Sequence, residues 1–532
     1  MTSVLSSTTM TLCLENIPQE ILEHIAFHLG TNIFLGPPSD LASLVVTNRH
    51  LESRLSLSKN HTLYAKIFTN KFDITIAKRR LGPDRVSAPV LAEELQRRCI
   101  YLKRLRSRKD ATSFPSQESD DKDLRELLFH AYLLMLENEG RNECQLREYG
   151  HIDLWLHEYW FSDNGRSLAK RSIKANEWPS QTDHSAVAMW LFWFLLRPEG
   201  YTRDVEASWN VLNVLKLFAL GAHRYHLTSP SWLDFIPPPH PHESNAIIHY
   251  SEIYRIKTPP LASPAILSFL TLVNRMLGSP EFATSIDRAP LAMLQRSTTG
   301  TEWECEWGRC INLGQPSFDK VLMMSFTPGS IEGVWEGIFT YTEFTAYAAL
   351  LSGAPPPVLQ KSLVVKHRQT WKLREHHLLA TEPVTDSPVP TSIDDFDLLS
   401  SGDPLRSYFP TGTRIKEDHN GLEVREPGGK EPLYYKRACF LQPDEQRHVC
   451  DIIITGEGHS AWGQFNLVGR VRPCDGFISF SKDYVDGDRG KWLYRGYLIG
   501  NADGNLAGRW RDTLSPVAVP GYEGCFTMSR RR

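Results

Sequence analysis

The sequence predicts an α+β multidomain protein with an N-terminal three-helix domain, a helical middle region and a C-terminal antiparallel β-barrel. Three observations lead to this fold class. Apolar residues recur at helical spacing between Leu12 and Phe68, further helical stripes follow from residue 124 to 328, and glycines alternate with aromatic residues at strand period from Gly329 onwards. The 532 residues are enough for about three domains.

Composition narrows the class of protein further. The chain is 41% hydrophobic and 23% charged, and its net charge of −3 gives no reason to expect nucleic acid or an anionic membrane as partner. Nine cysteines without a repeating spacing suggest reduced thiols and a cytoplasmic or nuclear protein. The most apolar run, Ala186 to Leu196, is too short for a membrane span of about 20 residues and predicts a buried helix.

The first helix is predicted from about residue 14 to residue 30. Pro18 takes its first helical position and Gly30 its end, where these residue types favour a helix start and a helix stop. Its apolar residues recur three and four positions apart: Ile17, Ile21, Leu22, Ile25 and Leu29. A second helix is expected from about Asp40, and a third apolar group ends at Phe68. Three short helices bury too little surface for comfortable stability, so this segment is expected to have a partner.

These residues resemble the F-box. Ile17-Pro18 corresponds to its Leu-Pro, Glu20-Ile21-Leu22 to the Glu-aliphatic-Leu that follows, Leu41 to Val46 to its second helix, and Leu63-Tyr64 to its closing Leu-Trp. The sequence departs from the family in the long loop Thr31 to Ser39, in Thr47 and in Tyr64. A generic helical N-terminal cap is the alternative for residues 12–68.

The resemblance implies that this segment binds a Skp-type adaptor and, through it, a cullin–RING ubiquitin ligase. Aliphatic side chains would insert into a groove of the adaptor, and a few buried anchors would supply the affinity. The residues expected to bind the adaptor are Ile17, Pro18, Ile21, Leu22, Ile25, Leu41, Val45, Leu63 and Tyr64.

Two segments connect the N-terminal helices to the barrel. Residues 69–123 form a basic helical segment and a polar linker, and most of the basic residues fit a solvated helix face. A nuclear-import signal in LKRLRSRK and a surface for an acidic partner are the alternatives. Residues 124–328 are expected to form a helical spacer domain.

The barrel is expected over residues 329–532, with a long insertion at 342–450 that carries a helix over Gln369 to Leu379. The first and last strands share one signature, a glycine between two aromatic residues on one face, as in Trp335-Gly337-Phe339 and Tyr522-Gly524-Phe526. This signature predicts that Gly333 to Tyr341 pairs with Tyr522 to Ser529. Turn signals at roughly ten-residue spacing favour an antiparallel meander.

This half also resembles the C-terminal domain of F-box proteins whose β-barrel holds the substrate. The residues that carry the resemblance are SYFPTGTRI, GHSAWGQF, GYLIGNADGNLAGRWRD and GYEGCF, and their arrangement is similar to the large F-box families of mushroom-forming fungi. The resemblance implies a non-catalytic substrate receptor of an SCF-type (Skp–cullin–F-box) ubiquitin ligase, with a protein as its substrate.

Within the barrel, Arg509, Trp510 and Arg511 are the candidate substrate-binding residues. An arginine offers a planar fork of donors that suits a carboxylate or another polar end of a peptide. The alternative is an arginine that stacks on Trp510 to close the barrel.

No catalytic, metal-binding or cofactor-binding motif occurs in the sequence, so no cofactor is expected. Three other functions compete with the ligase subunit. They are a lipocalin-like barrel that binds a small ligand, an F-box scaffold outside a ubiquitin ligase, and an enzyme built on the barrel. A barrel interior with polar groups would favour peptide capture, whereas an all-apolar interior would favour a lipid or pigment.

Overall fold

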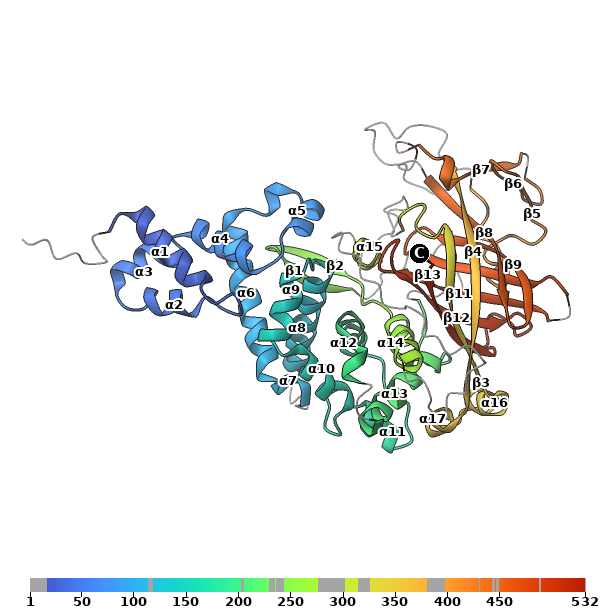
Figure 1. The fold of residues 1–532 in the computed structure, drawn as a ribbon, viewed down its shortest axis with the longest axis horizontal. Coiled ribbons are helices and arrows are strands. Elements are labelled where there is room, and N and C mark those ends of the chain that lie inside the picture. The colour runs from blue at the N-terminus through green and yellow to red at the C-terminus, as the bar shows by residue number, and fades with distance from the viewer. Residues whose placement is uncertain are drawn as a thin grey trace, which may run out of the picture. The chain divides into compact units, whose positions relative to one another are not determined.

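The structure is a computed structural model that describes residues 17–112, 118–201, 205–228, 235, 244–275, 302–313, 326–379, 398–429, 431–442, 445, 449–487 and 489–531. The fold is α+β, with many helices in the N-terminal half and a closed antiparallel β-barrel at the C-terminus (Figure 1). The described residues form two compact units. Unit 1 comprises Met1–Lys109, Glu137–Ile152 and Ile248–Glu252, and unit 2 comprises Asp110–Leu136, Asp153–Ile247 and Ile253–Arg532.

Unit 1 is helical. Its helices are α1 (Gln19–Thr31), α2 (Ser39–Val45), α3 (Arg49–Leu55), α4 (His61–Lys71), α5 (Thr75–Leu81), α6 (Ala88–Ser107) and α9 (Arg141–Cys144), with short helical turns at Pro83–Arg85 and Gln145–Tyr149. The expected single second helix is two helices, so the prediction of three helices in this segment was wrong. Asn48 breaks the helix because its side chain accepts a hydrogen bond from the backbone amide of Leu51 and so caps α3.

Close packing of α1 on α4 depends on Gly30. The residue lies within α1, and an added Cβ atom would stand 2.6 Å from Cδ1 of Ile67 in α4. The helix continues to Thr31, so Gly30 does not end it as the sequence predicts. Its role is instead to let the two helices approach, with Leu22 and Phe68 fully buried.

A buried polar network ties together three segments of unit 1. Glu137 accepts hydrogen bonds from His249 Nε2 (2.7 Å) and Arg98 Nη2 (3.2 Å). Arg98 also pairs with Glu94 through Nε at 3.1 Å and donates to the Tyr250 hydroxyl at 3.0 Å. These side chains are almost completely buried, so each charge depends on its partners for the solvation that water would otherwise give.

Unit 2 contains helices as well as the barrel. They include α8 (Glu118–Leu136), α10 (Ile152–Phe161), α11 (Ala169–Lys174), α12 (Asp183–Leu195), α13 (Val205–Leu220), α14 (Ala262–Arg275), α15 (Glu304–Asn312), α16 (Phe344–Leu351) and α17 (Pro357–Lys361). The prediction of a buried helix around Ala186 to Leu196 is confirmed by α12, whose side chains from Ser185 onwards are all buried. In the parts of the chain that the structure describes, no helix is long and apolar enough to cross a membrane.

Strands β1 (Asn245–His249) and β2 (Glu252–Ile256) form a two-stranded hairpin between α13 and α14. Most of the predicted helical spacer (residues 124–328) falls in unit 2 together with the barrel, so the boundary at residue 328 stays a prediction.

The barrel has eight antiparallel strands: β3 (Gly333–Thr342), β4 (Val364–Leu379), β8 (Val449–Ser460), β9 (Gly463–Arg472), β10 (Phe477–Tyr484), β11 (Lys491–Ile499), β12 (Asn505–Asp512) and β13 (Glu523–Arg530). They follow the order β3-β13-β12-β11-β10-β9-β8-β4, and the pairing of β3 with β4 closes the ring. The predicted pairing of the first and last strands is confirmed, with Phe526 opposite Phe339 and Arg530 opposite Trp335.

The predicted helix over Gln369 to Leu379 was wrong, because these residues belong to β4. The strand pairs with β3 along one edge and with β8 along the other, and both of its faces are buried from Glu375 to Leu378. Burial on both faces removes the alternation by which a strand is usually recognised. The end of β4 also pairs with a small sheet formed by β7 (Leu433–Arg437), β6 (Gly421–Arg425) and β5 (Arg414–Glu417).

Aromatic side chains meet across the barrel interior. The Trp371 ring of β4 lies 5.5 Å from the Tyr494 ring of β11 and 5.5 Å from the Phe526 ring of β13, measured between ring centroids. Lys482 of β10 points into the same space, with its Nζ 3.9 Å from the centroid of Phe465. Among the described residues, the interior is therefore a core of aromatic and aliphatic side chains with the Lys482 amine inside it.

Candidate functional site

The nine predicted adaptor-binding residues differ widely in exposure. Leu22, Leu41, Leu63 and Tyr64 are buried in unit 1, and the Tyr64 hydroxyl donates a hydrogen bond to the Leu55 carbonyl. These four side chains hold the helices of unit 1 together, so a partner does not reach them without a rearrangement.

The remaining predicted residues are accessible. Ile17, Ile25 and Val45 are half-buried, whereas Pro18 and Ile21 are exposed, with 53% of Ile21 accessible. Residues 18, 21 and 25 lie three and four positions apart and share one face of α1. α2, which packs against α1, is followed directly by Val46, which is 81% exposed and was missing from the predicted set. We call Pro18, Ile21, Ile25, Val45 and Val46 the apolar face of unit 1.

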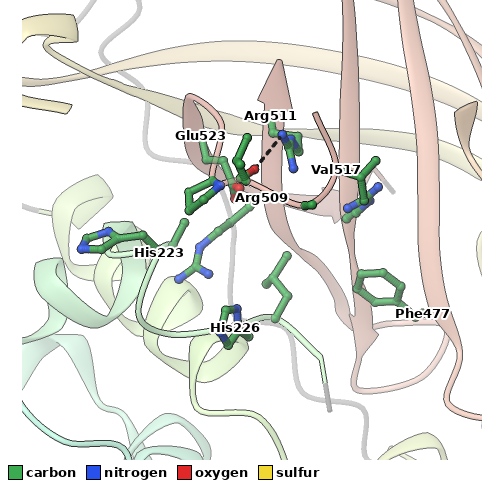
Figure 2. Close-up of a pocket in the computed structure, with 13 residues that line it drawn as sticks. His223, His226, Phe477, Arg509, Arg511, Val517 and Glu523 are labelled. Atoms are coloured by element: carbon green, nitrogen blue, oxygen red, sulfur yellow. Dashed lines mark hydrogen bonds between the residues drawn. The ribbon is translucent and has the colours of Figure 1, made fainter. Parts of the chain in front are cut away.

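A second site lies on the outer face of the barrel in unit 2. A cavity of about 170 Å³ opens between strands β11 to β13, the loop that follows α13, and the loop between β12 and β13 (Figure 2). Its charged lining residues are Arg495, Arg509, Arg511 and Glu523. We call this cavity the arginine pocket.

Strand register brings these four residues together. Arg495 of β11 is directly opposite Arg509 of β12, and Arg511 is directly opposite Glu523 of β13. Alternate residues of a strand point to opposite faces, so all four lie outside the barrel while Trp510 points inside. The structure therefore places Arg509 and Arg511 on the outer face of the barrel and Trp510 in its interior, 4.6 Å from the ring of Tyr341. Stacking of either arginine on Trp510 is prevented by the same alternation.

Arg509 fixes the barrel to the end of α13. Its guanidinium donates to the backbone carbonyls of Phe218 and Ala219, both at the C-terminus of α13, and to the carbonyl of Tyr225. Figure 2 shows this side chain extending toward the loop that carries His223 and His226. A cation at a helix C-terminus satisfies carbonyls that have no partner within the helix and interacts favourably with the helix dipole.

Arg511 and Arg495 are also held by backbone carbonyls. Arg511 Nη2 donates to the carbonyls of Ser515 (3.1 Å) and Val519 (3.4 Å), which shapes the loop between β12 and β13. Arg495 Nη2 donates to the carbonyl of Pro404. Arg495, Arg509 and Arg511 are each no more than 3% exposed. Backbone carbonyl oxygens are thus among the hydrogen-bond partners of all three guanidiniums.

Burial shifts the ionisation of the groups around the pocket. Burial raises the pKa of Glu523, although the neighbouring arginines act in the opposite direction. Burial, together with Arg224 and Arg509, lowers the pKa of His223 to about 4, and burial with Arg509 lowers the pKa of His226. Burial lowers the pKa of Arg495 to about 9, which leaves it protonated at neutral pH. At neutral pH the histidines are uncharged and the arginines dominate the electrostatics of the pocket.

Sequence reasoning missed Arg495 and Glu523. The signal for Arg495 was present in the turn sequence Asn501-Ala502-Asp503-Gly504, because a hairpin centred there places residue 495 opposite residue 509. Glu523 lies beside these arginines because β13 pairs with β12. The sequence alone does not give this pairing.

Comparisons with protein-family models, with curated proteins and with solved structures found no match for this chain. Among the residues that the structure describes, no group of three or more His, Cys, Asp or Glu side chains could hold a metal ion.

Proposed function

We propose that this protein is the substrate-recognition subunit of an SCF-type ubiquitin ligase, in which the N-terminal helices bind a Skp-type adaptor and the barrel domain binds the protein substrate. The observation that carries the proposal is the apolar face of unit 1. Pro18 and Ile21 are exposed at the start of α1, while Leu22 of α1 and Leu41 of α2 are buried. Exposed aliphatic side chains on α1 and directly after α2 favour docking on a partner.

The proposed mechanism is non-covalent. The apolar face would attach the protein to the ligase, and the barrel domain would hold the substrate near the ubiquitin-conjugating enzyme. Acceleration would come from a raised effective concentration of substrate and from its orientation, so no residue of this chain performs chemistry.

The barrel interior argues against the alternative of a lipocalin-like protein. Rings from β4, β11 and β13 meet across it at centroid distances of 5.1 to 5.5 Å, and Lys482 and Gln369 lie among them. A ligand would have to displace these side chains, because close-packed rings leave no space for another molecule between them. A scaffold outside a ligase differs from the proposed receptor only in its partners, which the following experiment identifies.

Replacing Ile21 by Asp is expected to abolish co-purification of the adaptor and cullin with the tagged protein from its own cell extract. A carboxylate buried in an apolar interface costs several kcal/mol, which corresponds to a loss of binding of a hundredfold or more. Leu22→Asp would be a poor test, since Leu22 is fully buried and its replacement would disrupt unit 1 itself.

The matched control is Ile100→Asp, which changes an isoleucine of α6 that is 56% exposed, much like Ile21. The control should retain the adaptor and cullin. Retention of both by Ile21→Asp, or their absence from the wild-type sample, would refute the proposal. An adaptor that co-purifies without cullin would indicate a scaffold outside a ligase.

A further inference from the structure

Strand β5 forms an open edge of the sheet that continues the barrel. It is the last strand in the order β4-β7-β6-β5, and among the described residues it pairs with β6 alone (Figure 1). Arg414, Lys416 and Glu417 are exposed in this strand, while Ile415 is half-buried. An edge strand presents a row of unpaired backbone N–H and C=O groups, to which another extended chain can add.

The hydrogen bonds of the β5–β6 hairpin indicate which backbone groups face this open edge. Asp418 donates its N–H to the Gly421 carbonyl at 3.0 Å, so these two residues form a hydrogen-bonded pair. Such pairs alternate with non-bonded pairs along an antiparallel ladder, so the next one joins Lys416 to β6. The N–H and C=O groups of Ile415 and Glu417 therefore point away from β6, toward the open edge.

Two cations stand beside these backbone groups. The side chains of Arg414 and Lys416 share one face of β5, because alternate residues of a strand point the same way. Neither side chain forms an ion pair with any residue that the structure describes. Both charges are therefore available to a chain that adds at the open edge.

The nearest carboxylates act on such a chain less strongly. Asp418 is turned into the hairpin, where its Oδ1 accepts hydrogen bonds from the amides of Asn420 (2.7 Å) and Gly421 (3.0 Å). Glu423 belongs to β6 and pairs with Arg425 at 3.4 Å. An added strand would lie about 4.8 Å from β5 but about 10 Å from β6, and charges separated by more than about 8 Å are largely screened at physiological salt.

The two cations select the kind of strand that can add. A second copy of β5 would bring like charges together, which disfavours association of the chain with itself. An acidic strand would instead place carboxylates opposite Arg414 and Lys416. Its intervening residues would lie on the face of Ile415, which packs against the buried Leu422 and Val424. The edge therefore favours a peptide in which acidic and apolar residues alternate.

We infer that the open edge of β5 is a docking site for an extended acidic peptide, which adds to the sheet as a further strand and pairs its carboxylates with Arg414 and Lys416. Backbone hydrogen bonds would supply affinity, and the two cations would supply selectivity. If the proposed receptor function holds, and this last step rests on it, the peptide is a segment of the protein substrate.

Calorimetric titration of the full chain with a blocked nine-residue peptide of alternating Glu and Val tests the inference. We expect saturable binding that weakens as the salt concentration rises. The same peptide with Lys in place of every Glu should bind at least tenfold more weakly. The absence of saturable binding of the acidic peptide, or equal binding of the two peptides, would overturn the inference.

Strand addition has a signature that charge attraction lacks. Only alternate amides of an added strand face its neighbour, and the others face away. Two further acidic peptides therefore carry N-methyl groups, one at the Glu amides and one at the Val amides. We expect one of them to lose binding at least tenfold and the other to keep it. Binding that both peptides retain, or that both lose, would overturn strand addition.

A charge reversal places the site on β5. The double variant Arg414→Glu with Lys416→Glu is expected to lose the acidic peptide and to bind the Lys peptide instead, a gain that a misfolded variant would not produce. The matched control is Arg489→Glu, which changes an exposed arginine of the turn between β10 and β11 and should leave both affinities within twofold. A double variant that still prefers the acidic peptide would overturn the inference.

Sedimentation velocity of the peptide-free chain tests the other occupant of the edge. We expect a monomer at the concentrations of the titration. A dimer that the acidic peptide dissociates would identify a second copy of β5 as the occupant and would overturn the inference.

This test is independent of the adaptor. Ile21→Asp should bind the acidic peptide as the wild type does, because its substitution lies in unit 1 and β5 belongs to unit 2. A failure of peptide binding with adaptor binding intact would remove this inference alone. The reverse result would remove the proposed function alone.

Discussion

Replacing Lys482 by Met is expected to stabilise the barrel by about 3 kcal/mol at pH 6.5. Burial lowers the pKa of Lys482 from 10.5 to about 7. At about 1.4 kcal/mol per pKa unit, this shift corresponds to roughly 5 kcal/mol of destabilisation of the charged amine. The rings of Phe465 and Tyr484 lie under the ammonium group, and this cation–π attraction reduces the gain from its removal.

The stability gained by Lys482→Met should shrink as pH rises. Between about pH 7 and 10.5 the amine is protonated in the unfolded chain but neutral in the folded one, so the unfolded state binds more protons. The free energy of unfolding of the wild type therefore increases with pH across this window, and Lys482→Met lacks this contribution. Denaturant unfolding of both proteins at pH 6.5, 8 and 9.5, followed by tryptophan fluorescence, measures the difference.

A matched control for this experiment is Lys491→Met, which changes a half-exposed lysine that pairs with Asp483 at 3.0 Å. Its effect on stability should stay within about 1 kcal/mol at every pH. A Lys482→Met variant that is less stable than the wild type at pH 6.5, or whose advantage does not depend on pH, would contradict the prediction.

Replacing Glu137 by Gln is expected to destabilise unit 1 by about 3 to 5 kcal/mol. Glu137 is buried and accepts hydrogen bonds from both His249 and Arg98, so its neutral replacement leaves buried positive charge with less compensation. A fall in the denaturant midpoint of the phase that reports on unit 1 measures the loss. The control Glu252→Gln breaks a half-exposed pair with Arg85 at 3.8 Å and should cost no more than about 1 kcal/mol.

Because of the Glu137 carboxylate, we also expect unit 1 to lose stability in acid. Burial raises the pKa of Glu137, but the charges of His249 and Arg98 and the hydrogen bond from His249 outweigh it and lower the pKa. An acid whose pKa is lowered by folding stabilises the fold above its unfolded pKa and loses this contribution as pH falls through the folded value. Wild-type unit 1 should therefore weaken below about pH 4.5, whereas Glu137→Gln should show less of this dependence. Equal acid sensitivity of the two proteins would contradict the assignment.

The parts of the fold that sequence reasoning anticipated have a strong local signature. Trp335, Gly337 and Phe339 alternate on one face of β3, and Gly524 and Phe526 of β13 repeat the pattern, so the closing pair of strands was predictable. The stretch Gln369 to Leu379 lacked such a signature, because the barrel covers one face of β4 and further chain covers the other. Local pattern cannot reveal burial that depends on distant segments.

The candidate sites, like the fold, could be predicted from the sequence only in part. Arg509 and Arg511 were identified because they are neighbours in sequence, whereas Arg495 joins them only through the register of β11 and β12. Ile21 and Leu22 of α1 were both recognised as important, but the sequence does not distinguish Leu22, which packs inside, from Ile21, which faces out. Only the packing of α1 against other helices separates these two roles.

The closure of the barrel by β13 also sets the order in which a nascent chain can mature. β13 is the last of the eight strands to be synthesised, yet it lies between β3, the first, and β12. Until residue 530 has left the ribosome, β3 and β12 each have one edge of unpaired backbone groups, which invites association with other strands. A chain that terminates before β13 would therefore become a substrate for chaperones and proteases rather than a shorter working protein.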